Sequence, residues 1–112
     1  MVKFTAIILL GLTLLLSSLV VQATDPGPNL EEKAVKKVIP VYPPLARRKR
    51  VEGKVVIAIQ VDANGVVTEV EFLEGNALFK PVTLQAAPQW SFQKSANGMK
   101  GHIVFNFKLG TE

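Results

Sequence analysis

Few side chains in this chain of 112 residues could do covalent chemistry. There is no cysteine, which excludes disulfides, thiolate nucleophiles and thiolate metal ligands. His102 is the single histidine, and without a second ligand or a catalytic partner near it we interpret it as a solvent-facing strand residue. Glu69 and Glu71 share one face of a predicted strand, where they act as solubilising charges. No phosphate-binding glycine loop is present. We expect no enzyme activity, no metal ion and no cofactor.

The basic residues are the other candidates for a functional role. The formal net charge is +4, and the densest basic run is Arg47, Arg48, Lys49 and Arg50. Because this excess is small and no aromatic residues alternate with the basic ones, we expect no binding of nucleic acid. The run could contact an anionic surface such as lipid or lipopolysaccharide, and the alternative is a solvated helix end.

The first 23 residues have the pattern of an export signal. A short basic start at Lys3 precedes an uncharged apolar stretch, and Val21-Gln22-Ala23 gives a cleavage site before Thr24. We predict a signal peptide over 1–23. The alternative is an uncleaved membrane anchor, because residues 4–21 come close to the length that spans a bilayer. The membrane is expected as a partner only through this segment.

Residues 24–37 are polar and contain Pro26-Gly27-Pro28, so we predict a tether with one loose helical turn and a spacing role. After it, Pro40, Pro43 and Pro44 force an extended segment, because each proline fixes its own φ and restricts the residue before it. A short helix is predicted from Pro43 or Pro44 through Arg50.

A β-hairpin follows that helix. Alternation over 54–62 places Val55, Ile57, Ile59 and Val61 on one face. Asn64-Gly65 is a strong hairpin signal, and a two-residue loop there predicts that Val61 pairs with Thr68, Ile59 with Val70 and Ile57 with Phe72.

The second half of the domain is predicted to be a helix followed by a strand. Phe79, Val82, Ala86 and Trp90 recur at helical spacing, and Pro88 limits the helix to about Ala87. We expect Trp90 in the core. The last strand has these inward residues: Ile103, Phe105, Phe107 and Leu109. Its outward residues are His102, Val104, Asn106 and Lys108.

These elements predict an α+β fold. Its parts are a three-stranded antiparallel sheet, one packed helix and a short N-terminal helix. The domain is expected over residues 38–110.

An ordered set of landmarks across this region resembles a known family. They are Tyr42-Pro43-x-x-Ala46, Val51-Glu52-Gly53, Asp62-x-x-Gly65-x-Val67, Leu78-Phe79, Trp90-x-Phe92, Asn97-Gly98 and Phe105-x-Phe107. The set is similar to the TonB C-terminal domain. Lys80 and Lys94 depart from the family's usual residues at their positions, and residues 4–21 lack the histidine through which a full TonB anchor engages its motor.

The resemblance implies a Gram-negative cell-envelope protein, located in the periplasm or anchored in the inner membrane and facing it. The implied partner is an extended peptide, the TonB box of an outer-membrane transport receptor, added beside the last strand by β-augmentation. The implied pairing edge comprises Ile103, Val104, Phe105, Asn106, Phe107, Lys108 and Leu109. Tyr42 and Pro43 are implied to lie near the docking region. An alternative is a homodimer formed through the same edge.

Overall fold

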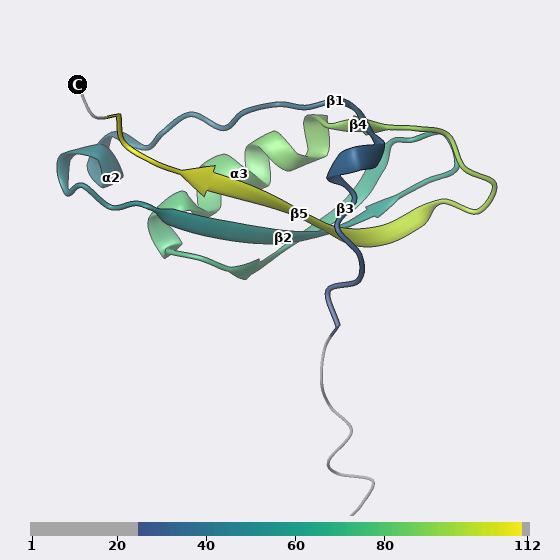
Figure 1. Cartoon of the computed structure of the whole chain (residues 1–112), viewed down its shortest axis with the longest axis horizontal. Helices are drawn as coiled ribbons and strands as arrows, with labels where there is room; N and C mark the ends of the chain where they lie inside the picture. Colours follow the sequence, from purple (N-terminus) through teal and green to yellow (C-terminus); the bar gives the residue numbers. More distant parts are fainter. Residues whose placement is uncertain (1–24, 111–112) are drawn as a thin grey trace, which may run out of the picture.

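A three-stranded antiparallel sheet organises the domain in the computed structural model, which describes residues 25–110. Strand β2 (Gly53–Val61) lies between β3 (Val67–Glu74) and β5 (Met99–Phe107). Both pairings are antiparallel, and the helices cover one face of the sheet (Figure 1). The predicted fold class is confirmed.

The alternation of apolar residues decides which face of the sheet is covered. The odd-numbered residues of β2 from Val55 to Val61 are buried, as are Ile103, Phe105 and Phe107 of β5. Facing pairs such as Ile57 with Ile103 bring β-branched side chains together on the covered face. The predicted inward faces of both strands are therefore correct up to Phe107.

The hairpin between β2 and β3 differs from the prediction at its tip. The loop has three residues, Ala63–Gly65, because the N–H of Gly65 bonds to the carbonyl of Asp62 and the N–H of Asp62 to that of Val66. The register shifts between Gln60 and Val61, so Val61 pairs with Val67 and the predicted pairing with Thr68 is wrong. The other two predicted pairs, Ile57 with Phe72 and Ile59 with Val70, are confirmed.

Three consecutive helical segments cross the inner face of the sheet: η2 (Ala77–Phe79), α3 (Lys80–Ala86) and η3 (Ala87–Gln89). Asn76 caps the start, since its side chain accepts a hydrogen bond from the N–H of Leu78 at 2.9 Å. The predicted end near Ala87 is confirmed. Thr83, which the apolar pattern missed, takes a fully buried position by donating its hydroxyl to the carbonyl of Phe79.

The short helix α2 (Pro44–Arg48) ends earlier than predicted. Lys49 is its C-cap residue, and Arg50 has a φ of +54° in the left-handed region. The N–H of Val51 then bonds to the carbonyl of Ala46, which closes the helix end. The helix therefore cannot continue through Arg50.

The predicted tether is wrong for most of its length. Residues 28–36, here called the N-terminal strap, pack onto the domain through a turn, η1 (Glu31–Lys33), and a strand, β1 (Ala34–Lys36). Strand β1 pairs with β4 (Ser91–Phe92), and Leu30 is 2% exposed within the core. Burial of Leu30 and a second small sheet stabilise this placement. The predicted helical turn is present at η1.

The predicted signal peptide at 1–23 lies outside the described residues. Among residues 25–110, no helix is long and apolar enough to cross a bilayer.

Candidate functional site

Strand β5 lies at an edge of the sheet, and the N-terminal strap covers only its first part. The N–H of His102 bonds to the carbonyl of Pro28, and the N–H of Leu30 bonds to the carbonyl of His102, both at 2.9 Å. Asn29 and His102 thus form a parallel bridge. The edge is closed at His102.

Further along β5 the same edge is open. In an antiparallel ladder the backbone groups of alternate residues point to the same side, so those of Val104 and Asn106 point as those of His102 do. Within residues 25–110 no backbone hydrogen bond meets Val104 or Asn106 from that side. Unpaired N–H and C=O groups on an edge strand are a template for another extended chain.

A groove of about 470 Å³ runs beside this open edge. It is lined by residues 37–40 and 104–108, with Glu31, Tyr42 and Trp90. The extended segment between β1 and α2 forms its second wall and follows β5 along the domain (Figure 1). The groove therefore combines open backbone groups with apolar side chains.

Trp90 fixes the second wall of the groove to the core. Its indole Nε1–H donates to the carbonyl of Val38 at 3.0 Å, and its ring meets that of Phe105 edge-on at 5.6 Å. The side chain is only 5% exposed, so the expectation that Trp90 belongs to the core is confirmed. This bond ties the backbone of Val38 to the core, against which the Val38 side chain also packs.

Tyr42 holds the far end of the same wall. Its ring lies edge-on to Phe79 and Phe107, which stack on each other at 4.0 Å. Its hydroxyl donates to the carbonyl of Val51, and the Arg47 guanidinium lies 5.0 Å from the ring centroid. Tyr42 is thus a rigid part of the groove.

Only some of the predicted docking residues line the groove. Val104 to Lys108 and Tyr42 line the groove, whereas Ile103 is fully buried and Pro43 serves as the N-cap residue of α2. Leu109 lies beyond β5, where its N–H bonds to the carboxylate of Glu52 at 2.6 Å. The predicted inward position of Leu109 is therefore wrong, because the strand pairing ends at Phe107.

No sequence signal marked Val38, Ile39 and Pro40 as groove residues. Their extended conformation followed from the prolines, but their position beside β5 has no local signal. His102 is also placed differently, because it is half-buried and its Nδ1 lies 2.9 Å from the carbonyl of Gly27. It therefore holds the chain at the start of the N-terminal strap.

The predicted basic run lies at α2 and the turn after it, and all four of its side chains are exposed. None of them lines the groove. Across the described part of the chain, no cluster of three or more histidine and carboxylate side chains could hold a metal ion.

Comparisons with known proteins match this region. A profile of the family described as Gram-negative bacterial TonB protein C-terminal matches residues 38–109. Protein TonB of Xanthomonas campestris pv. campestris (strain B100) is 36% identical over 93 residues, which cover 77% of this chain and 42% of that protein. Protein TonB of Yersinia enterocolitica is 36% identical over 91 residues, covering 79% of this chain and 33% of that protein. The chain thus matches less than half the length of each relative.

A solved structure shows the same fold. The solution NMR structure of the Pseudomonas aeruginosa TonB CTD superposes with a TM-score of 0.57 at 25% sequence identity. The match covers 71% of this chain and 88% of that one. Profile, sequence and fold agree, and the chain belongs to the non-enzymatic TonB C-terminal domain family of Gram-negative bacteria.

Proposed function

We propose that this domain binds an extended peptide segment of an outer-membrane transport receptor, and that the peptide adds as a strand to the open edge of β5. The single observation that carries this proposal is the pair of open backbone positions, Val104 and Asn106, beside an apolar groove. Family membership supports the receptor as the partner and energy-dependent transmembrane transport as the process.

The open edge sets the strength of such a complex. Val104 and Asn106 each offer one N–H and one carbonyl to the peptide. A protein hydrogen bond contributes about 0.5–1.5 kcal/mol net, and ordering the peptide opposes this gain. Contacts with Tyr42 and Trp90 in the groove would then supply the remaining affinity and the selectivity.

The N-terminal strap sets the register of the peptide. Because Pro28 and Leu30 already bond to His102, a new strand can pair only beyond that residue. The distance from Val104 to Lys108 accommodates a peptide strand of about five residues at roughly 3.3 Å per residue. The domain therefore selects a short segment.

Titration of the domain with a set of overlapping peptides, followed by NMR, tests this function. Synthetic peptides tiled over the periplasmic segments of the host's outer-membrane receptors are added to the 15N-labelled domain. We expect a binder to slow amide exchange at Val104 and Asn106 and to leave Val70, on the opposite edge strand, unchanged. Binding that protects only residues outside β5 and the groove would overturn the proposal.

A homodimer formed through β5 is the second outcome of that test. Edge strands that are open to a peptide are also open to a second copy. A stable dimer in sedimentation equilibrium, with protection at Val104 and Asn106 before any peptide is added, would assign the edge to assembly instead.

The location proposed for the domain is the periplasm. The export pattern of residues 1–23 supports it in both alternatives, a cleaved signal peptide and a retained inner-membrane anchor. The intact mass in periplasmic and membrane fractions of the native host distinguishes them. A soluble species beginning at Thr24 indicates a free periplasmic domain, while a membrane species that retains residues 4–21 indicates an anchored protein.

A further inference from the structure

Positive charge is concentrated in one stretch of the chain. Residues 33–50 contain no acidic residue, and their basic residues are Lys33, Lys36, Lys37, Arg47, Arg48, Lys49 and Arg50. All of these side chains are exposed. We name the exposed side chains of residues 33–50 the cationic strip.

Apolar side chains are exposed within the first basic group of the cationic strip and between its two basic groups. Val35 is 71% exposed, Ile39 88% and Val41 74%. They alternate with the half-buried residues Val38 and Tyr42, so the extended segment presents its odd-numbered side chains to solvent. Large apolar residues at such exposure, arranged in a row, mark an interaction surface.

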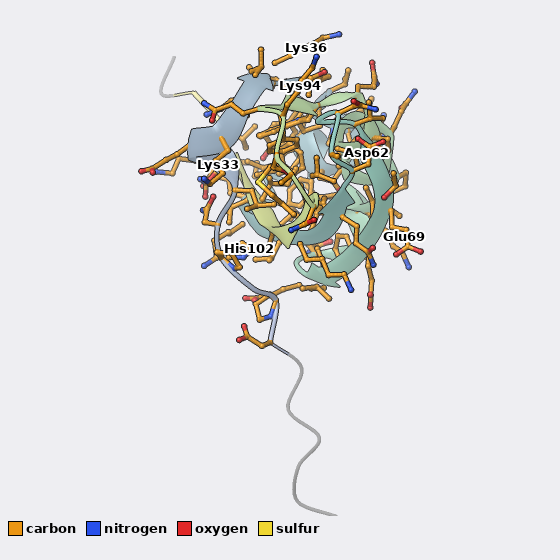
Figure 2. The ribbon with its side chains drawn as sticks, turned by 90° about the vertical axis from the view of Figure 1, so that its right-hand side faces the viewer. Lys33, Lys36, Asp62, Glu69, Lys94 and His102 are labelled. Atoms are coloured by element: carbon orange, nitrogen blue, oxygen red, sulfur yellow. The ribbon has the colours of Figure 1, made fainter. Side chains whose placement is uncertain are left out.

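Three acidic residues, Asp62, Glu69 and Glu71, lie away from the cationic strip, whereas Glu31, Glu32 and Glu52 adjoin it in the sequence. Glu69 and Glu71 belong to β3, and Asp62 precedes the loop that leads to it. Figure 2 shows Asp62 and Glu69 on the right of the domain, Lys33 on the left and Lys36 at the top. The carboxylates of β3 therefore favour an orientation in which the cationic strip, and not the β3 edge, faces a negatively charged surface.

We infer that the cationic strip docks the domain on the surface of a bilayer rich in anionic phospholipids. A row of apolar side chains with cations at both ends is the arrangement of a protein that lies in the headgroup region. The apolar row enters the boundary of the acyl chains while the long basic side chains reach the phosphates. Lys37 and Ile39 belong both to the cationic strip and to the wall of the groove proposed for the peptide, whereas Val35, Val41 and the basic run of α2 lie outside that groove.

The position of the chain entry is compatible with such docking. Asp25 to Gly27 lie on the side of the domain opposite β1 (Figure 1). Residues 25–27 therefore do not cover the cationic strip.

Vesicle binding tests the inference. The protein used for this test begins at Thr24 and keeps the described core from Leu30 to Phe107. Binding to phosphatidylcholine vesicles is compared with binding to vesicles that also contain phosphatidylglycerol, at low and at high salt. We expect binding to the anionic vesicles only, with a loss of about tenfold or more at high salt because screening weakens the attraction.

A charge-matched pair of variants locates the binding surface. The strip variant carries Arg47→Ser, Arg48→Ser and Arg50→Ser. The control variant carries Lys54→Ser, Lys80→Ser and Lys100→Ser, which removes the same charge outside the strip. Because each basic residue near an anionic surface strengthens binding roughly fivefold, the strip variant should bind about a hundredfold more weakly, and the control should change much less.

The apolar row has its own variant, Ile39→Ser with Val41→Ser, which keeps every charge and should reduce vesicle binding by about tenfold or more. Circular dichroism checks that each variant is folded. If the strip variant and the control variant lost equal affinity for anionic vesicles, the attraction would depend on net charge alone and the inference would be overturned. Equal binding to neutral and anionic vesicles, or binding to isolated peptidoglycan without binding to vesicles, would also overturn it.

Discussion

The carbonyl oxygen of Pro28 lies directly against the backbone of Gly101 in β5. A Cβ atom at Gly101 would be only 2.3 Å from that oxygen and 2.7 Å from Cγ of Leu30. The backbone of Gly101 is not in the left-handed region, so alanine could adopt its conformation. The absence of a side chain at this one position therefore permits the N-terminal strap to dock.

Gly101→Ala should release the N-terminal strap without unfolding the sheet. The two hydrogen bonds between His102 and the strap would be lost, together with the burial of Leu30, and the free energy of unfolding should fall by about 1–3 kcal/mol. Hydrogen exchange should become fast at His102 and Leu30 and remain slow at Ile57. Unchanged exchange at His102 would show that the strap tolerates the extra methyl group.

Leu30→Ala provides the matched comparison for that prediction. It removes the buried side chain and leaves Gly101 intact. If both substitutions act by releasing the same segment, their destabilisations should not add in the double variant, because the strap can be lost only once. Additive losses in urea denaturation would contradict this mechanism.

Release of the strap should also lengthen the peptide that β5 accepts. In the wild-type protein, peptides extended past His102 should bind no more tightly than peptides of about five residues. In Gly101→Ala the longer peptides should gain affinity, because the N–H and carbonyl of His102 become available. Isothermal titration of one binding peptide and its truncations measures this. If the wild-type protein bound longer peptides more tightly, the proposed limit at His102 would be wrong. If it bound no peptide at all, the peptide-binding function itself would be rejected.

Asn106→Pro should weaken peptide binding through the backbone alone. Proline removes the outward N–H of Asn106 and is tolerated on an edge strand, since that group does not pair with β2. We expect a loss of about 1–2 kcal/mol in binding free energy and little change in thermal stability. The control is Asn106→Ala, which keeps the N–H and should bind nearly as the wild type does. Equal losses in both variants would assign the effect to the side chain.

Arg50→Gly should stabilise the domain. Arg50 has a φ of +54°, which glycine adopts without the steric cost that a side chain carries. We expect a gain of about 0.5–1 kcal/mol in the free energy of unfolding. Arg48→Gly removes the same charge inside α2 and should cost about 1 kcal/mol instead. Chemical denaturation of both variants checks this, and a loss of stability in Arg50→Gly would contradict it.

Trp90→Phe should loosen the second wall of the groove. The substitution keeps an aromatic ring near Phe105 and removes the hydrogen bond to the carbonyl of Val38. We expect a loss of about 1–2 kcal/mol in stability and faster exchange at Ile39. Hydrogen exchange at Ile57, inside the sheet, serves as the reference. An equal increase in the exchange rates of Ile39 and Ile57 would indicate general destabilisation.

The sequence by itself determined the elements whose signals are local. Alternation in β2 and β5 predicted the buried faces, including Ile57 and Ile103, because the side-chain period of a strand is two. Pro43 and Pro44 limited the start of α2 to one of two adjacent residues, and Pro88 placed the end of the longer helix, because proline acts within one turn of itself. Asn64-Gly65 located the hairpin but not its three-residue loop, since several turn types accept that pair.

Only the tertiary structure decided the pairings between distant residues. Leu30 is one apolar residue in a polar stretch, and its burial depends on the space above Gly101. Likewise, the groove exists because Trp90 binds Val38, 52 positions away in the chain. Such contacts depend on complementary shape and on backbone groups that must find partners, and neither quantity is expressed in local periodicity. The sequence therefore predicted the last strand, and the family resemblance implied that it is an edge, while the fold determined which part of that edge is open.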